Sequence, residues 1–230
     1  MQSVVNQEFL DKRGKYARWG SYIGFAALFI GLITALRQPL LSYLFLLIGL
    51  LAASFGSYMS NRYVREPRPD QRLAEAMENL DKRYVLYNYY LPSDHVVFSH
   101  HGFTVLEPRP HEGEVIYRDG RWKHKAGFRK ILQFFGEPAL GKPDQDLERQ
   151  VEWVQEFVEQ IPSEEEIAVH GAIVFTHPNV ELDLEDLDIP AVKLDELPEF
   201  MKEGLRDQPF LSTSQRREIR SMLDDMVAQA

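Results

Sequence analysis

Two long apolar runs near the start of the chain constrain its fold more than any other feature. Residues 19–36 and 40–59 contain no charged side chain. Each run has about 18–20 residues, which is enough to cross a hydrocarbon core of ~30 Å at ~1.5 Å per residue. Only Arg37, Gln38 and Pro39 separate the runs, so a tight turn must join them. We therefore expect a helical hairpin that crosses a lipid bilayer twice.

The residues that flank the runs predict the orientation of this hairpin. Four basic residues precede the first run and four arginines follow the second, whereas the turn carries only Arg37. Because Lys and Arg accumulate on the cytoplasmic side, we expect a two-span protein of the cell membrane with both termini in the cytoplasm. A cleavable signal peptide is the alternative for the first run, but no small-residue cleavage site follows it and a second span comes at once.

The composition of the two runs favours an anchor over a transporter. Neither run contains an acid or a histidine that would mark an ion path. Small residues recur on one face of each run and should let the two helices approach closely. These residues are Gly24, Ala27 and Gly31 in the first run, and Gly49, Ala52 and Gly56 in the second.

The net charge of −9 is unevenly distributed. Residues 1–65 carry seven basic and two acidic residues, a balance of +5, which leaves −14 for residues 66–230. A nucleic-acid-binding surface is normally basic, so the acidic balance counts against tight binding to DNA. The chain has no cysteine, which excludes disulfides and thiolate metal sites.

We divide the chain into five parts. They are a cytoplasmic N-terminal segment at 1–18, the transmembrane hairpin at 19–60, a proline-rich linker at 61–69, a folded domain at 70–205 and an amphipathic C-terminal helix at 206–230. Hydrophobic spacing predicts helices that start near Asp70, cover 143–161 and cover 195–205. It predicts strands at 84–91, 167–176 and 189–192, while 181–188 reads as an exposed acidic loop rather than a calcium site. In the last helix, Ser212 and Gln215 form a capping box.

A predicted β-hairpin at residues 94–109 carries the candidate site. Its arms are two apolar runs joined through His100, His101 and Gly102. Asp94 opens the first arm, and Glu107 and Arg109 close the second, so the fold of a hairpin would bring these three side chains together. Two carboxylates and a cation are the groups that a Mg²⁺-dependent phosphodiester-cleaving site needs. Pro108 and Pro110 remove two ladder donors, so this strand must lie at an edge or end there.

This arrangement resembles the nuclease-related domain (NERD) family of the restriction-endonuclease-like PD-(D/E)XK superfamily. The resemblance rests on Asp94, Gly102 with the strand after it, and Glu107-Pro108-Arg109, and covers roughly residues 69–197. Gly113 and Trp122 follow at the family's second hairpin, as the family pattern has them. The resemblance implies an α+β fold in which two transmembrane helices precede a restriction-endonuclease-like domain with a central mixed sheet flanked by helices.

The match at the site is partial. The family has lysine where this chain has Arg109, and arginine cannot share protons with an attacking water as lysine can. Asp70 occupies the slot of a helix-opening glutamate, with an ordinary acidic helix start as the alternative. The helix at 143 should open on Asn-Pro and a glutamine; Lys142 replaces the asparagine, and Asp146 or Gln145 takes the glutamine slot.

Two functions follow from this pattern. If the site is active, Asp94, Glu107 and the backbone carbonyl of Pro108 would hold Mg²⁺ or Mn²⁺, and the protein would cut DNA or RNA at the membrane. We favour a degenerate site in a membrane-anchored binding or regulatory module, with a protein partner or nucleic acid as its ligand.

Two further features have structural explanations. A basic cluster, Lys123, His124, Lys125, Arg129 and Lys130, is either a phosphate-contacting patch or a solvated hairpin, and the acidic domain favours the hairpin. His170 lies inside an apolar strand, so we expect a hydrogen-bonded core residue rather than a metal ligand.

Overall fold

The computed structural model describes residues 1–125, 139–163, 166–206 and 208–229. The chain separates into two compact units. One unit is made of Gln7–Arg68. The other combines Met1–Asn6 with the part of the chain that follows Pro69.

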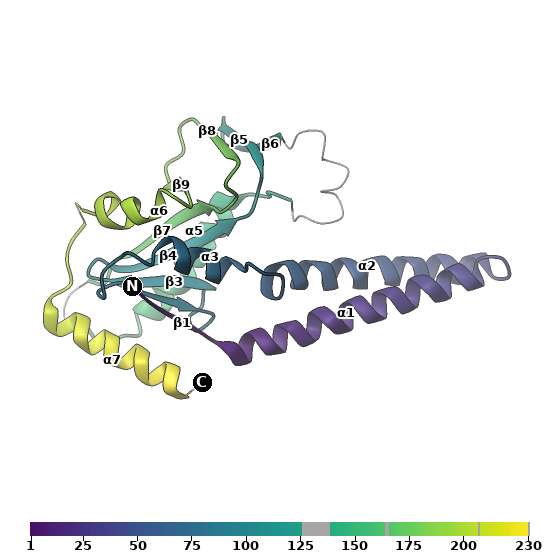
Figure 1. The fold of residues 1–230 in the computed structure, drawn as a ribbon, viewed down its shortest axis with the longest axis horizontal. Helices are drawn as coiled ribbons and strands as arrows, with labels where there is room; N and C mark the ends of the chain where they lie inside the picture. Colours follow the sequence, from purple (N-terminus) through teal and green to yellow (C-terminus); the bar gives the residue numbers. More distant parts are fainter. Residues whose placement is uncertain (126–138, 164–165, 207, 230) are drawn as a thin grey trace. The chain divides into compact units, whose positions relative to one another are not determined.

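Helices α1 (Gln7–Thr34) and α2 (Pro39–Tyr63) form an antiparallel hairpin (Figure 1). Both are long and apolar enough to cross a membrane. Small residues line the contact between them, because a Cβ added to Gly24 would lie 2.5 Å from the Ala53 backbone nitrogen. The Ser42 hydroxyl also donates to the Gly31 carbonyl at 2.7 Å. The close approach predicted from the small residues is therefore confirmed.

A six-stranded mixed sheet forms the centre of the other unit, in the order β1-β2-β3-β4-β7-β9. Three of its pairs are parallel (β1 with β2, β4 with β7, β7 with β9), and the two pairs that β3 makes are antiparallel. Its strands are β1 (Gln2–Val5), β2 (Val85–Asn88), β3 (His95–Ser99), β4 (Gly102–Arg109), β7 (Val169–Phe175) and β9 (Ala191–Lys193).

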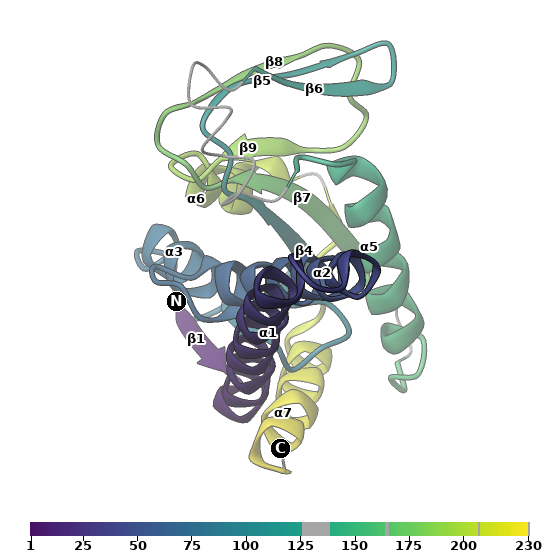
Figure 2. The ribbon, with the colours of Figure 1, turned by 90° about the vertical axis from the view of Figure 1, so that its right-hand side faces the viewer.

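Alternate side chains of the sheet enter two separate cores. Phe103 and Val105 of β4 join one core together with residues of α5 (Pro143–Val158) and α7 (Thr213–Gln229). Leu106 joins the other core, under α3 (Pro69–Ala76), α6 (Leu197–Glu199) and the π-helical turn η1 (Phe200–Gly204). Figure 2 shows α3 and α5 on opposite sides of β4.

A smaller sheet of β6 (Arg121–Lys125), β5 (Gly113–Arg118) and β8 (Val180–Leu184) completes this unit (Figure 2). Strands β5 and β6 form a hairpin, in which Arg118 lies opposite Arg121 and the turn residues Asp119 and Gly120 have φ values of 52° and 70°. Positive φ at both central residues is typical of a two-residue hairpin turn.

One sequence prediction is wrong, the structure decides between two alternatives for another, and one strand was not predicted. The acidic loop at 181–188 was wrong for its first part, because Val180–Leu184 form β8, where acids alternate with leucines. β4 is not an edge strand; it lies between β3 and β7 and ends at Arg109, the other alternative that its prolines allowed. No pattern in the first residues predicts β1, which pairs with β2 across more than 80 positions of sequence.

Candidate active site

The β3–β4 hairpin brings Asp94 and Glu107 to its open end. Val96 lies opposite Val105 and Ser99 opposite Gly102. The ladder between β3 and β4 ends at the pair Val96 and Val105, with Asp94 two residues before it and Glu107 two residues after it. Gly102 makes the turn possible, because it has a φ of 93° and an added Cβ would lie 2.3 Å from the Ala168 carbonyl oxygen.

Arg109 is held between two carboxylates. Its Nη2 lies 3.0 Å from Glu107 Oε1 and 2.6 Å from Asp146 Oδ2. Its Nη1 donates to the Leu140 carbonyl at 3.3 Å. The side chains of Glu107 and Arg109 are 5% and 12% exposed, so water screens their attraction only weakly. This is a buried ion pair on the face of β4 that α5 covers.

Gln150 of α5 forms a hydrogen bond with the second carboxylate oxygen of Glu107. Its Nε2 donates to Glu107 Oε2 at 2.5 Å, and its Oε1 accepts from the Ser93 hydroxyl at 2.7 Å. Sequence reasoning missed both Gln150 and Ser93. The available signal was the spacing of Asp146 and Gln150, since residues four apart share one face of a helix.

Asp70 is buried in the first turn of α3, and the Tyr89 hydroxyl donates to its Oδ1 at 3.3 Å. The Tyr89 amide in turn donates to the Asp94 carbonyl at 2.8 Å. Tyr89 has a φ of 64°, a conformation that is uncommon for a residue with a side chain. Tyr89 therefore connects Asp70 with the first residue of the candidate hairpin.

The residues at this site do not fit a divalent cation in the arrangement observed. A hard cation needs several oxygen ligands, but each carboxylate oxygen of Glu107 already accepts a hydrogen bond or contacts a guanidinium. Among the described residues, no three Asp, Glu or His side chains lie where they could hold a metal ion. Pro108, the expected source of a backbone ligand, lies opposite Val174 in the β4–β7 ladder, and its role stays a prediction.

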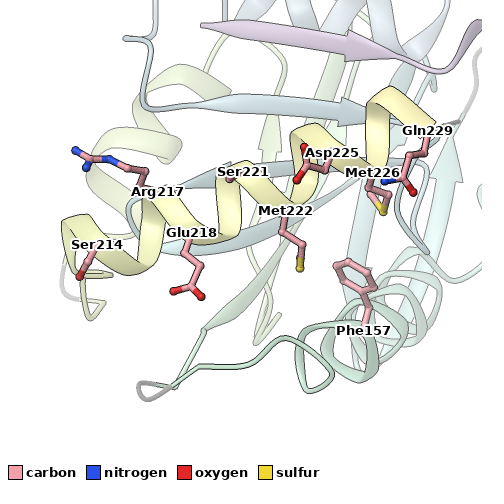
Figure 3. Close-up of a pocket in the computed structure, with 9 residues that line it drawn as sticks. All are labelled: Phe157, Ser214, Arg217, Glu218, Ser221, Met222, Asp225, Met226 and Gln229. Carbon is pink, nitrogen blue, oxygen red and sulfur yellow. The ribbon is translucent and has the colours of Figure 1, made fainter.

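A pocket of about 840 Å³ lies elsewhere, between α7 and the end of α5. Figure 3 shows Met222, Met226 and Phe157 turned toward one another there. None of the residues that line it belongs to the candidate site. Its position gives no support to a substrate cleft at Glu107.

Two members of the basic cluster, Lys125 and His124 of β6, contact neighbouring groups of the protein. Lys125 Nζ lies 3.0 Å from Glu114 Oε2, and His124 Nε2 lies 2.7 Å from the Glu112 carbonyl. These contacts favour a solvated hairpin over a phosphate-contacting patch. Arg129 and Lys130 lie outside the described residues.

His170 lies in β7 and is half-buried rather than part of the core that we expected. Burial lowers its pKa, and a hydrogen bond with the His101 backbone opposes that effect. Its Nε2 is buried without a partner among the described residues. A neutral ring is therefore favoured at this position.

A mixed sheet with helices on both faces, and an acid-and-cation pair at the open end of a central hairpin, define a nuclease-like module. Residues 65–176 match the family model of the nuclease-related domain, NERD. The match identifies a nuclease-related domain at these residues, and two helices suited to a membrane hairpin precede it. Comparison with curated proteins and with solved structures gave no match.

Proposed function

We propose that the protein anchors a nuclease-related domain to the cytoplasmic face of the cell membrane, where it serves as a non-catalytic binding or regulatory module. The observation that carries this proposal is the Arg109 guanidinium between Glu107 and Asp146. The contact occupies the carboxylate that a catalytic metal would need.

The partners of Arg109 support an ion pair as the stable state of the site. The resemblance implies lysine at 109 and allows the glutamine slot at either 145 or 146. Lysine at 109 with glutamine at 146 would leave a more weakly paired cation beside Glu107. Here Asp146 supplies a second negative charge at 2.6 Å, and Arg149 contacts its other oxygen at 3.0 Å. Arginine, which stays charged and binds carboxylates through a planar fork, is suited to such a permanent pair.

The surface of the α1–α2 hairpin supports membrane anchoring. Only 28% and 17% of the residues in the most apolar windows of α1 and α2 are buried, whereas a core helix of a water-soluble protein is mostly buried. Large apolar side chains cover the outside of both helices, for example Phe25, Leu32 and Leu47. In water this surface would be very costly, and in lipid it is favourable.

The pairing of β1 supports a hairpin whose two ends lie on one side of the membrane. β1 directly precedes α1, and α3 directly follows α2 by a short linker. Since β1 and α3 belong to the same compact unit, the segments before and after the hairpin must share one compartment. The basic residues at both ends favour the cytoplasm as that compartment.

Cleavage assays with the full-length protein in detergent test the catalytic part of this proposal. The unmodified protein, Glu107→Ala, Arg109→Lys and the double variant Arg109→Lys/Asp146→Gln are incubated with plasmid and single-stranded substrates in Mn²⁺. We expect no cleavage by the unmodified protein. Cleavage that appears only in the double variant would support a site silenced by its paired substitutions.

Cleavage by the unmodified protein that disappears in Glu107→Ala would overturn the proposal and establish a metal-dependent nuclease. Arg149→Lys is the matched control, because it changes an arginine beside Asp146 without touching Glu107. It should behave as the unmodified protein.

A further inference from the structure

A second pocket, of about 250 Å³, is lined mainly by basic side chains, and we call it the basic pocket. It lies between the turn before β2, strand β3 and the first turns of α7. Five of its seven lining residues are cations, although residues 66–230 as a whole carry −14. The lining residues are Lys82, Arg83, Phe98, Thr213, Arg216, Arg217 and Arg220.

Two of the five cations are neutralised by neighbouring acids. Arg83 Nε donates to Asp81 Oδ2 at 2.8 Å, and Arg220 Nε lies 3.0 Å from Asp224 Oδ2. For the other three, Lys82, Arg216 and Arg217, the described part of the chain offers no ion-pair partner. The pocket therefore holds three uncompensated positive charges at one place.

Helix α7 places its arginines at the pocket by burying its opposite face in the core. Arg216 and Arg220 are four residues apart and lie on one face. The other face is apolar, where Ile219 and Leu223 are buried in the core. Arg217 lines both this pocket and the one near Phe157, and in Figure 3 its side chain extends away from Phe157 and Met226.

The start of α7 is tied to the β3–β4 hairpin. The Leu211 amide donates to the His100 carbonyl at 2.9 Å, and the Phe210 ring stacks on His100 with centroids 5.3 Å apart. The Ser212 hydroxyl caps the helix by accepting from the Gln215 amide at 3.3 Å. These contacts hold the start of α7 beside the hairpin, and the buried Phe98 ring forms part of the pocket wall.

We propose that the basic pocket binds a small phosphorylated ligand through Lys82, Arg216 and Arg217. Guanidinium groups bind phosphate oxygens in pairs, and lysine adds a point charge. The N-terminal turn of α7, at Thr213, adds a favourable dipole for an anion. A volume of about 250 Å³ suits one phosphate ester, carried either by a soluble molecule or by an anionic lipid headgroup. The proposal is independent of the state of the Glu107 site.

The pKa of His100 gives a second measure of whether the basic pocket holds a ligand. Burial lowers its pKa to about 4, with His101, Arg83 and Arg216 as further positive neighbours that contribute. A bound phosphate would neutralise part of this positive field and raise the pKa of His100. An NMR titration of His100 therefore reports on the pocket without any assumption about activity.

Binding is tested with the full chain in phosphatidylcholine nanodiscs. Inorganic phosphate and glycerol 3-phosphate are the soluble probes, and nanodiscs that contain phosphatidic acid are the lipid arm. We expect at least about tenfold weaker binding in Arg216→Gln/Arg217→Gln, because each charged hydrogen bond contributes about 1.5–3 kcal/mol. Arg121→Gln/Lys123→Gln is the matched control, with the same charge change on β6, and should bind as the unmodified protein.

Response to the soluble probes identifies a free phosphate ester, and response only to phosphatidic acid identifies a lipid headgroup; both support the proposal. Equal loss of binding in the pocket variant and its control would overturn it. So would binding of single-stranded nucleic acid through Arg216 and Arg217 with no response to any small phosphate. Thermal unfolding of all variants verifies that each one is folded.

Discussion

Arg109 illustrates how one substitution changes the chemistry of a site while its geometry is kept. Its guanidinium joins the carboxylates of Glu107 and Asp146 where the side chains of Glu107 and Arg109 are almost inaccessible to water. A buried pair of this kind contributes little net stability compared with apolar residues, yet loss of one partner leaves an uncompensated buried charge.

We expect Arg109→Ala to lower the free energy of unfolding by about 3 kcal/mol, because it leaves Glu107 unpaired in the core. Urea unfolding of the full-length protein, followed by tryptophan fluorescence, measures this change. The matched control is Arg149→Ala, which removes a 55% exposed partner of Asp146 and should cost less than about 1 kcal/mol. Equal losses in the two variants would contradict a buried pair at Arg109.

His100 should make stability depend on pH. Burial above all lowers its pKa from 6.5 to about 4, so the unfolded chain binds a proton more readily between these values. The stabilisation is fully present above pH 6.5 and is lost as the pH falls toward 4. Substitution His100→Phe keeps the ring against Phe210 and should flatten the change in unfolding free energy between pH 7.5 and 4.5. An unchanged slope in this variant would refute the prediction.

At the scale of elements, β1 is the part of the sheet that depends most on long-range pairing. It lies parallel to β2, with Gln2 opposite Val85 and Val5 opposite Asn88. The amides of Gln2 and Asn6 donate to β2, which means that even-numbered residues point their N–H groups toward the sheet. Odd-numbered residues of this edge strand point their N–H groups outward.

We expect Val4→Pro to destabilise the protein by about 2 kcal/mol or more, because it removes a ladder donor and a side chain that packs on the core. Ser3→Pro is the control, since its N–H points away from β2 and edge strands tolerate such prolines. Thermal unfolding of both variants gives the comparison. A larger loss in Ser3→Pro would show that β1 pairs in another register.

At the scale of the whole molecule, both ends of the α1–α2 hairpin join the same folded unit. β1 and the linker at residue 68 connect the same folded unit to the two ends of the α1–α2 hairpin. With both helices crossing a membrane, as we propose, we expect the turn at Gln38 on the side opposite to β1 and α3.

Because the chain has no native cysteine, single-cysteine variants give an unambiguous test of this topology. In intact cells, we expect an impermeant thiol reagent to label Gln38→Cys and to leave Asp188→Cys unlabelled until the membrane is permeabilised. Asp188 is exposed in the folded unit, so its protection would come from the membrane alone. Labelling of Asp188→Cys in intact cells, with Gln38→Cys protected, would reverse the orientation.

The sequence by itself determined the features that depend on local pattern. The hairpin α1–α2, the turn at Asp119 and Gly120, the stripe of α5 and the β3–β4 hairpin all follow from spacing, since a helix or strand shows its buried face in its own period. The family resemblance pointed to Asp94, Glu107 and Arg109 as candidate site residues, and their roles there stay predictions.

Only the tertiary structure decided which partners these residues meet. The contact of Gln150 with Glu107, the pairing of β1 with β2 and the convergence of Lys82 with Arg216 join segments that are 43 to 134 positions apart. No local period records such contacts, because they depend on how strands and helices stack in three dimensions. The same physical reason explains why β8 was not predicted. Its acids and leucines alternate as in a strand, but the strand forms by pairing with β5.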